Sequence, residues 1–61
     1  MKIMYFVDEK KKTTRWVNLD GFTDIYTAID YAVAESKKHP SPYKIRVYDF
    51  ENERNVLYIE K

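Results

Sequence analysis

The chain has 61 residues, with 11 Lys or Arg against 10 Asp or Glu, one His and no Cys. Residues 1–61 are long enough for a single domain. The lack of cysteine excludes disulfides, thiolate zinc sites and iron–sulfur clusters, and one histidine excludes a multi-histidine metal site. A formal net charge of +1 gives no general reason to bind nucleic acid or an anionic membrane.

The N-terminal third predicts a β-hairpin. Ile3–Val7 is an apolar run of β-forming residues, and it is too short for a signal-peptide core or a membrane span, so we expect a cytoplasmic protein. Asp8–Lys12 is a charged loop, and Thr13–Leu19 alternates like a second strand. The segment between these two runs contains no Asn-Gly or Asp-Gly pair, so we expect a loop of four or more residues. Gly21, the one glycine, is expected to adopt a backbone angle that other residues resist.

The central segment predicts an amphipathic helix from Asp24 to about Lys38, with Thr23 as its N-cap and Pro40 after its end. Tyr31 falls off the apolar stripe and is expected at the surface. His39 is expected to be a solvated cation at the helix C-terminus. The apolar stripe comprises Ile25, Ala28, Ile29, Ala32 and Val33.

The C-terminal third predicts a second hairpin. Tyr43–Phe50 alternates cleanly, Glu51–Asn55 is a polar turn, and Val56–Ile59 is an unbroken apolar run. The predicted fold is therefore α+β: a ββαββ chain with a four-stranded sheet and one helix on one face. Unbroken apolar runs are typical of strands covered on both faces. We therefore expect the first and fourth strands to be central, in the order 2-1-4-3, with a right-handed crossover between strands two and three.

A helix of roughly fifteen residues is about 22 Å long and can cover only one face of such a sheet. Its apolar stripe is expected to pack on Val17, Ile45 and Val47. The apolar side chains left on the other face exceed the few hundred Å² that a soluble monomer usually exposes. We interpret that face as a partner or dimer surface, although ordinary exposed aromatics on twisted strands remain an alternative. One of the two last-strand pairs, Leu57 with Ile59 or Val56 with Tyr58, is also expected there. The residues expected to form the surface are Met4, Phe6, Trp16, Lys44, Arg46 and Tyr48.

Catalytic machinery is not apparent in the sequence. His39 has no neighbouring nucleophile, and one glycine cannot build a phosphate-binding loop. Asp49, Glu51 and Glu53 offer too few oxygens for a calcium loop and are interpreted as a solvated hairpin tip. We therefore expect no enzymatic activity, no cofactor and no metal site.

Two kinds of partner fit the predicted face. Aromatic rings beside Lys44 and Arg46 are typical of protein interfaces, so we expect a protein partner and a homodimer. The same mixture of rings and cations can stack on single-stranded nucleic acid, which is the alternative. The balanced charge and the absence of an RNA-binding signature favour protein binding.

A resemblance supports this interpretation. The hairpin from Ile3 to Leu19, the helix from Phe22 to Ala32, and the Tyr43–Asp49 strand with its successor span the chain. This layout resembles the short accessory proteins encoded by bacteriophages and mobile elements, several of which inhibit bacterial defence proteins, often as homo-oligomers. The resemblance implies a non-catalytic inhibitor in the host bacterial cytoplasm. It assigns no functional residues, because it rests on architecture and not on a motif.

Overall fold

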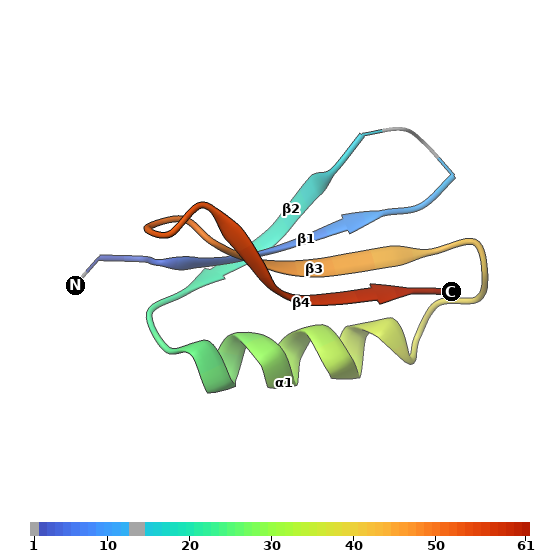
Figure 1. Cartoon of the computed structure of the whole chain (residues 1–61). Coiled ribbons are helices and arrows are strands. Elements are labelled where there is room, and N and C mark those ends of the chain that lie inside the picture. Colours follow the sequence, from blue (N-terminus) through green and yellow to red (C-terminus); the bar gives the residue numbers. More distant parts are fainter. Residues whose placement is uncertain (1, 13–14) are drawn as a thin grey trace.

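The computed structural model describes residues 2–12 and 15–61. One antiparallel four-stranded sheet lies on one helix, in the order ββαββ (Figure 1), so the α+β prediction is confirmed. The loop between the first two strands has more than four residues, as expected. The elements are β1 (Tyr5–Lys10), β2 (Val17–Phe22), α1 (Ile25–Ser36), β3 (Lys44–Asp49) and β4 (Arg54–Glu60).

The strand order is β2-β1-β3-β4, so the predicted order 2-1-4-3 is wrong. β1 pairs directly with β3, and β4 is an edge strand. The apolar run of β4 is therefore not explained by burial on both faces. Leu57 and Ile59 pack toward the core, whereas Tyr58 points to the other face. β2 and β3 are both antiparallel to β1 and hence parallel to each other. α1 therefore crosses over one face of the sheet to connect them (Figure 1).

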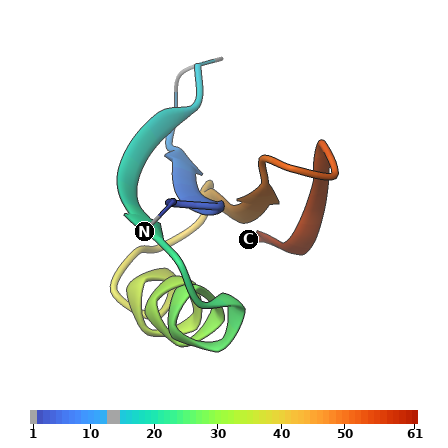
Figure 2. The same ribbon diagram turned by 90° about the vertical axis from the view of Figure 1, so that its left-hand side faces the viewer.

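Two irregularities lie in the same row of the sheet. The β1–β2 register shifts between Val7 and Asp8, and the β3–β4 register shifts between Val47 and Tyr48. Val7 and Val47 are themselves cross-strand partners. A bulge bends its strand and increases the local twist. Figure 2 shows the result: β2 and β4 flank the central strands and rise away from α1.

β1 and β2 are both displaced along the chain from their predicted positions. Asp8, Glu9 and Lys10, which were expected in a loop, belong to β1, and Asp8 and Glu9 are buried. The sequence pattern did not indicate the burial of Asp8 and Glu9, because charged side chains are buried in a sheet only where other groups pair with them. β2 begins at Val17, and residues 13 and 14 of its predicted span lie outside the described residues.

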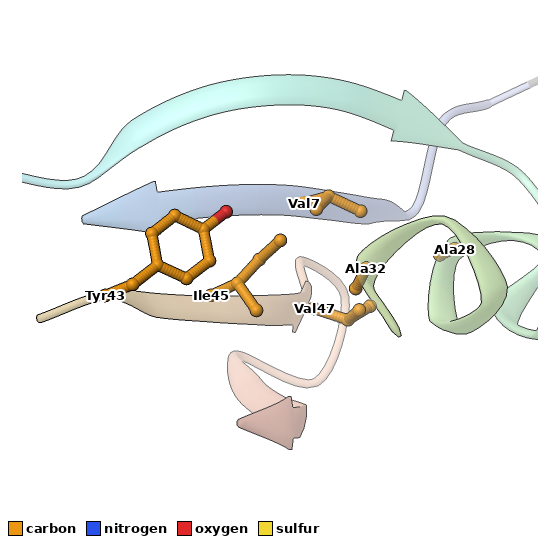
Figure 3. Close-up of a cluster of buried hydrophobic side chains, with 6 residues drawn as sticks. All are labelled: Val7, Ala28, Ala32, Tyr43, Ile45 and Val47. Carbon is orange, nitrogen blue, oxygen red and sulfur yellow. The ribbon is translucent and has the colours of Figure 1, made fainter. Parts of the chain in front are cut away.

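The core lies between α1 and the central strands. Three β-branched side chains of β1 and β3 and one tyrosine meet two alanines of α1 (Figure 3). Small side chains let the helix approach the sheet closely, so the buried ridge of α1 is centred on the alanines. The fully buried apolar residues are Val7, Ala28, Ala32, Tyr43, Ile45 and Val47.

One residue predicted in the core and one predicted at the surface are wrongly assigned. Val17 is 50% exposed, and Leu19 packs partly against the core in its place. Tyr31 is not a surface residue: it packs against the core, with its ring centroid 5.4 Å from that of Phe22. The buried side of the helix is centred on Ala28 and Ala32 of the predicted stripe and extends to Tyr31.

The helix N-cap is Asp24, and the assignment of Thr23 is corrected. The Asp24 carboxylate accepts hydrogen bonds from the Thr27 backbone N–H at 2.9 Å and from its hydroxyl at 3.0 Å. These bonds hold the pKa of Asp24 below its usual value. A carboxylate also suits the positive end of the helix dipole better than a neutral hydroxyl does.

Gly21 does not have the unusual backbone angle expected of it, because no described glycine has a positive φ. It lies inside β2, where space is the constraint. A Cβ atom at this position would lie 2.7 Å from Ile3 Cγ2 and 3.4 Å from the Phe6 ring. A side chain at position 21 would therefore require the Ile3 side chain to shift.

Gly21→Ala should lower the free energy of unfolding by about 1–3 kcal/mol, since an added methyl group in a filled site forces its neighbours apart. Denaturant unfolding checks this prediction. Ile3→Ala removes the closest atom, so Gly21→Ala should cost less in the Ile3→Ala background than in the wild type. An equal cost in both backgrounds would show that the contact with Ile3 is not the cause.

In the β3–β4 turn, Glu51 and Glu53 are exposed, as expected of a solvated tip, whereas the Asp49 carboxylate is buried. Asp49 accepts hydrogen bonds from the Asn52 amide at 2.7 Å and from the backbone N–H groups of Glu51 and Asn52 at 3.1 and 3.2 Å. The Asn52 hydrogen bond and the backbone bonds hold the pKa of Asp49 below its usual value. Glu53, in the same turn, adopts a left-handed angle with φ of 53°.

The lowered pKa of Asp49 predicts a loss of stability in acid. The contribution is complete above the unfolded-state pKa and is lost as the pH falls through the lower folded-state pKa. Asp49→Asn should therefore give a flatter dependence of the urea midpoint on pH below 3.8 than the wild type. Asp30→Asn, at an exposed helix position, is the control and should follow the wild type.

Candidate protein-binding face

The structure places all six predicted face residues on the side of the sheet away from α1. Cross-strand pairs align Phe6 with Tyr48 and Lys10 with Lys44, which puts their side chains on one face. Arg46 lies between Lys44 and Tyr48 on β3, and Trp16 packs over it. All six are half-buried, so their own neighbours cover part of each side chain. The six are Met4, Phe6, Trp16, Lys44, Arg46 and Tyr48.

Rings and cations stack along the middle of this face. The Arg46 guanidinium lies 4.4 Å from the Trp16 ring centroid and 5.1 Å from that of Tyr48. Lys10 Nζ lies 4.7 Å from the Trp16 centroid. A cation over an aromatic face is attracted by the ring quadrupole. With Tyr58, these residues form the ring–cation cluster: Lys10, Trp16, Arg46, Tyr48 and Tyr58.

The twist of the sheet brings side chains from both of its edges into this cluster. Trp16 directly precedes β2, and Tyr58 lies on β4, at the opposite edge of the sheet. Three strand spacings separate the two edges, about 14 Å. The ring centroids are nevertheless 6.3 Å apart, in an edge-to-face arrangement. Side chains from the two edges therefore meet over the central strands.

A buried ion pair fixes the position of Arg46. Its Nε donates to Asp8 Oδ2 at 3.0 Å, and the Asn18 amide donates to Asp8 Oδ1 at the same distance. Both Asp8 and Arg46 are largely shielded from solvent. Asp8 thus holds the guanidinium plane where the rings of Trp16 and Tyr48 can stack on it.

A second, more exposed patch lies at the N-terminal end of the same face. Phe6 and Phe50 contact each other edge to face, with centroids 5.9 Å apart. Phe50 is 56% exposed, and Ile3 is also largely exposed. Met4 is half-buried beside them, and its backbone pairs with that of Phe50. We call Ile3, Met4, Phe6 and Phe50 the N-terminal patch.

Sequence reasoning missed Asp8, Lys10 and Phe50 on this face, and it left open whether Tyr58 lies there. Asp8 and Lys10 were assigned to a loop, although they continue the alternation that begins at Phe6. Phe50 continues the alternation of Arg46 and Tyr48, and Tyr58 lies opposite Arg46. The alternation of the strands was therefore the available signal. For Asp8 and Lys10, the predicted end of the first strand at Val7 cut it short.

A separate polar cluster lies on the helix side, at the C-terminal end of α1. His39 is not the solvated cation expected: its ring stacks on Tyr43, with centroids 4.3 Å apart and planes within 14°. Its Nε2 lies 3.4 Å from Glu35 and 3.8 Å from Glu9. The Tyr43 hydroxyl donates to Glu9 at 2.9 Å, and burial, together with this bond, raises the pKa of Tyr43.

Comparisons with protein-family models, with curated proteins and with solved structures found no match. Within residues 2–12 and 15–61, no pocket is present. No helix in this described part combines the length and the apolar character needed to cross a membrane.

Arg46→Gln should lower the free energy of unfolding by about 1.5–3 kcal/mol, because it leaves the buried Asp8 carboxylate without its charged partner. Lys44→Gln is the matched control on the same strand and face. Lys44 pairs with an exposed Glu60 at 3.9 Å, so its loss should cost under about 1 kcal/mol. Equal costs for the two variants in urea unfolding would contradict a structural role for the Asp8–Arg46 pair.

Proposed function

We propose that this protein is a non-catalytic protein-binding module that acts as a homodimer, with the helix-free face of the sheet as its interaction surface. One observation carries the proposal. Aromatic and apolar side chains run along that face from Phe50 to Tyr58, and both end residues are about half exposed. Tyr, Trp, Phe, Met and Arg are the residue types enriched at the centres of protein interfaces.

The size of the molecule supports a single large interface. A standard protein–protein contact buries about 800 Å² on each partner. The accessible surface of this chain is 4305 Å², so such a contact would occupy nearly a fifth of it. A contact of that size needs one continuous side of the domain. The outer surface of α1 carries Tyr26 as its one large exposed apolar residue among those described.

The target that we propose is a bacterial defence protein, with this chain as a phage-type inhibitor in the host cytoplasm. The resemblance in layout to accessory proteins of bacteriophages and mobile elements supports this choice. The pre-stacked cluster around Trp16 also supports it, because rigid rings lose little conformational freedom when a partner binds.

Single-stranded nucleic acid is the second candidate, favoured by the cations that stack on Trp16. Arg46, however, already pairs with Asp8, so its charge is less available to a phosphate. Nucleic-acid binding would show an affinity that falls steeply with salt. Binding to single-stranded oligonucleotides at low salt, with that salt slope, would replace the protein-binding proposal.

Phe50→Ser and Tyr26→Ser test the proposal as a matched pair. Both remove an exposed ring, one on the proposed face and one on the outer side of α1. Phe50→Ser should raise the dissociation constant of the homodimer by at least about tenfold, equivalent to 1.4 kcal/mol. Tyr26→Ser should leave it unchanged. Sedimentation velocity over a concentration series measures both.

The target is tested with the same variants as baits in a bacterial lysate. A host protein retained by the wild type and by Tyr26→Ser, but lost with Phe50→Ser, supports the proposed face. A wild-type chain that stays monomeric at every concentration, and whose captured proteins are identical for all three baits, overturns the proposal.

A further inference from the structure

The cluster at the C-terminal end of α1 brings together three metal-binding side chains that are far apart in the sequence. Glu9 comes from β1, Glu35 from the last turn of α1, and His39 from the segment that follows the helix. One ligand atom from each lies within 4.8 Å of the other two. Glu9 is only 8% exposed, and the other two are half-buried.

We propose that Glu9, Glu35 and His39 bind one divalent transition-metal ion, with zinc as the best fit. Zinc bonds to imidazole nitrogen and carboxylate oxygen at 2.0–2.2 Å, so neighbouring ligand atoms of a tetrahedral site lie about 3.4 Å apart. His39 Nε2 lies 3.4 Å from Glu35 Oε2 and 3.8 Å from Glu9 Oε1. A side-chain adjustment of the half-buried Glu35 is enough to close the triangle.

The type of ligand atom argues for zinc over magnesium or calcium. Magnesium and calcium prefer sites made of oxygen ligands alone, whereas imidazole is a ligand for zinc, copper, iron and nickel. Three protein ligands leave a fourth position, which water fills at the half-exposed edge beside His39.

Surrounding groups already orient the three ligands. The Tyr43 ring stacks on His39 and fixes its plane, and the Tyr43 hydroxyl donates to Glu9. Lys61 Nζ donates to the backbone carbonyls of Ser36 and His39, each at 2.7 Å, which holds the segment after α1 in place. Such outer contacts set the direction of metal ligands.

In each of the two carboxylates, one oxygen lies near a lysine and the other remains accessible to a metal ion. Lys11 lies 3.6 Å from Glu9 Oε2, and Lys38 lies 3.4 Å from Glu35 Oε1. The other oxygen of each carboxylate faces His39. Each lysine therefore offsets one negative charge from outside, and a cation can approach the two inner oxygens and the imidazole.

A metal here would join β1, α1 and the α1–β3 segment, which are remote in sequence. Small domains without disulfides gain much from such a cross-link. The site is on the opposite side of the sheet from the proposed protein-binding face, so it does not depend on the proposed function.

The test is thermal unfolding of metal-free protein with and without ZnCl₂. Zinc at a hundred times its dissociation constant should raise Tm by about 20 °C for a domain of this size. The rise should saturate at one zinc per chain in calorimetric titration. Glu35→Gln and His39→Gln should each remove most of it. Glu60→Gln, which alters an exposed carboxylate outside the cluster, is the control and should keep the full rise.

If His39→Gln fails to fold, nuclear magnetic resonance of the wild-type protein tests the proposal instead. In the wild type, ZnCl₂ should shift the His39 imidazole resonances with the same one-to-one saturation. Unchanged imidazole resonances, no rise in Tm at saturating ZnCl₂, or an equal rise in Glu35→Gln and the wild type would each overturn the proposal.

Discussion

The structure depends on how β1 accommodates two adjacent carboxylates inside a small sheet. Asp8 and Glu9 are both buried, and because strand side chains alternate, they point to opposite faces. β3 and the residue just before it supply a partner for each: Arg46 pairs with Asp8, and Tyr43 donates to Glu9. An unpaired buried charge costs several kcal/mol, so these two contacts constrain the pairing of β1 with β3.

Each carboxylate also organises the face to which it points. On the helix-free side, Asp8 holds Arg46 under the rings of the ring–cation cluster. On the helix side, Glu9 ties Tyr43 and His39 to the end of α1. Among the described residues, no buried side-chain nitrogen or oxygen lacks a hydrogen-bond partner. The proposed interaction surface and the proposed metal site therefore both originate in neighbouring residues of one central strand.

The element order and six residues of the helix-free face could be predicted because both follow from local periodicity. Strand alternation placed Phe6, Arg46 and Tyr48 on one side, and the 3.6-residue period located the helix. The strand order could not be predicted, since an apolar run such as Val56–Ile59 has the same appearance in a central strand and in a bulged edge strand. Packing between distant segments decided the rest, including the close approach at Gly21 and the burial of Tyr31 and His39.

The paired bulges have a consequence for the two open edges of the sheet. A long, regular edge strand is a template onto which another chain can add, and proteins that leave one exposed tend to aggregate edge to edge. Here β2 and β4 are the edges, and each carries a register shift at the same row, beside Val7 and Val47. The kinks interrupt the row of free backbone groups on both sides. Such interruptions disfavour the edge-to-edge addition of another chain.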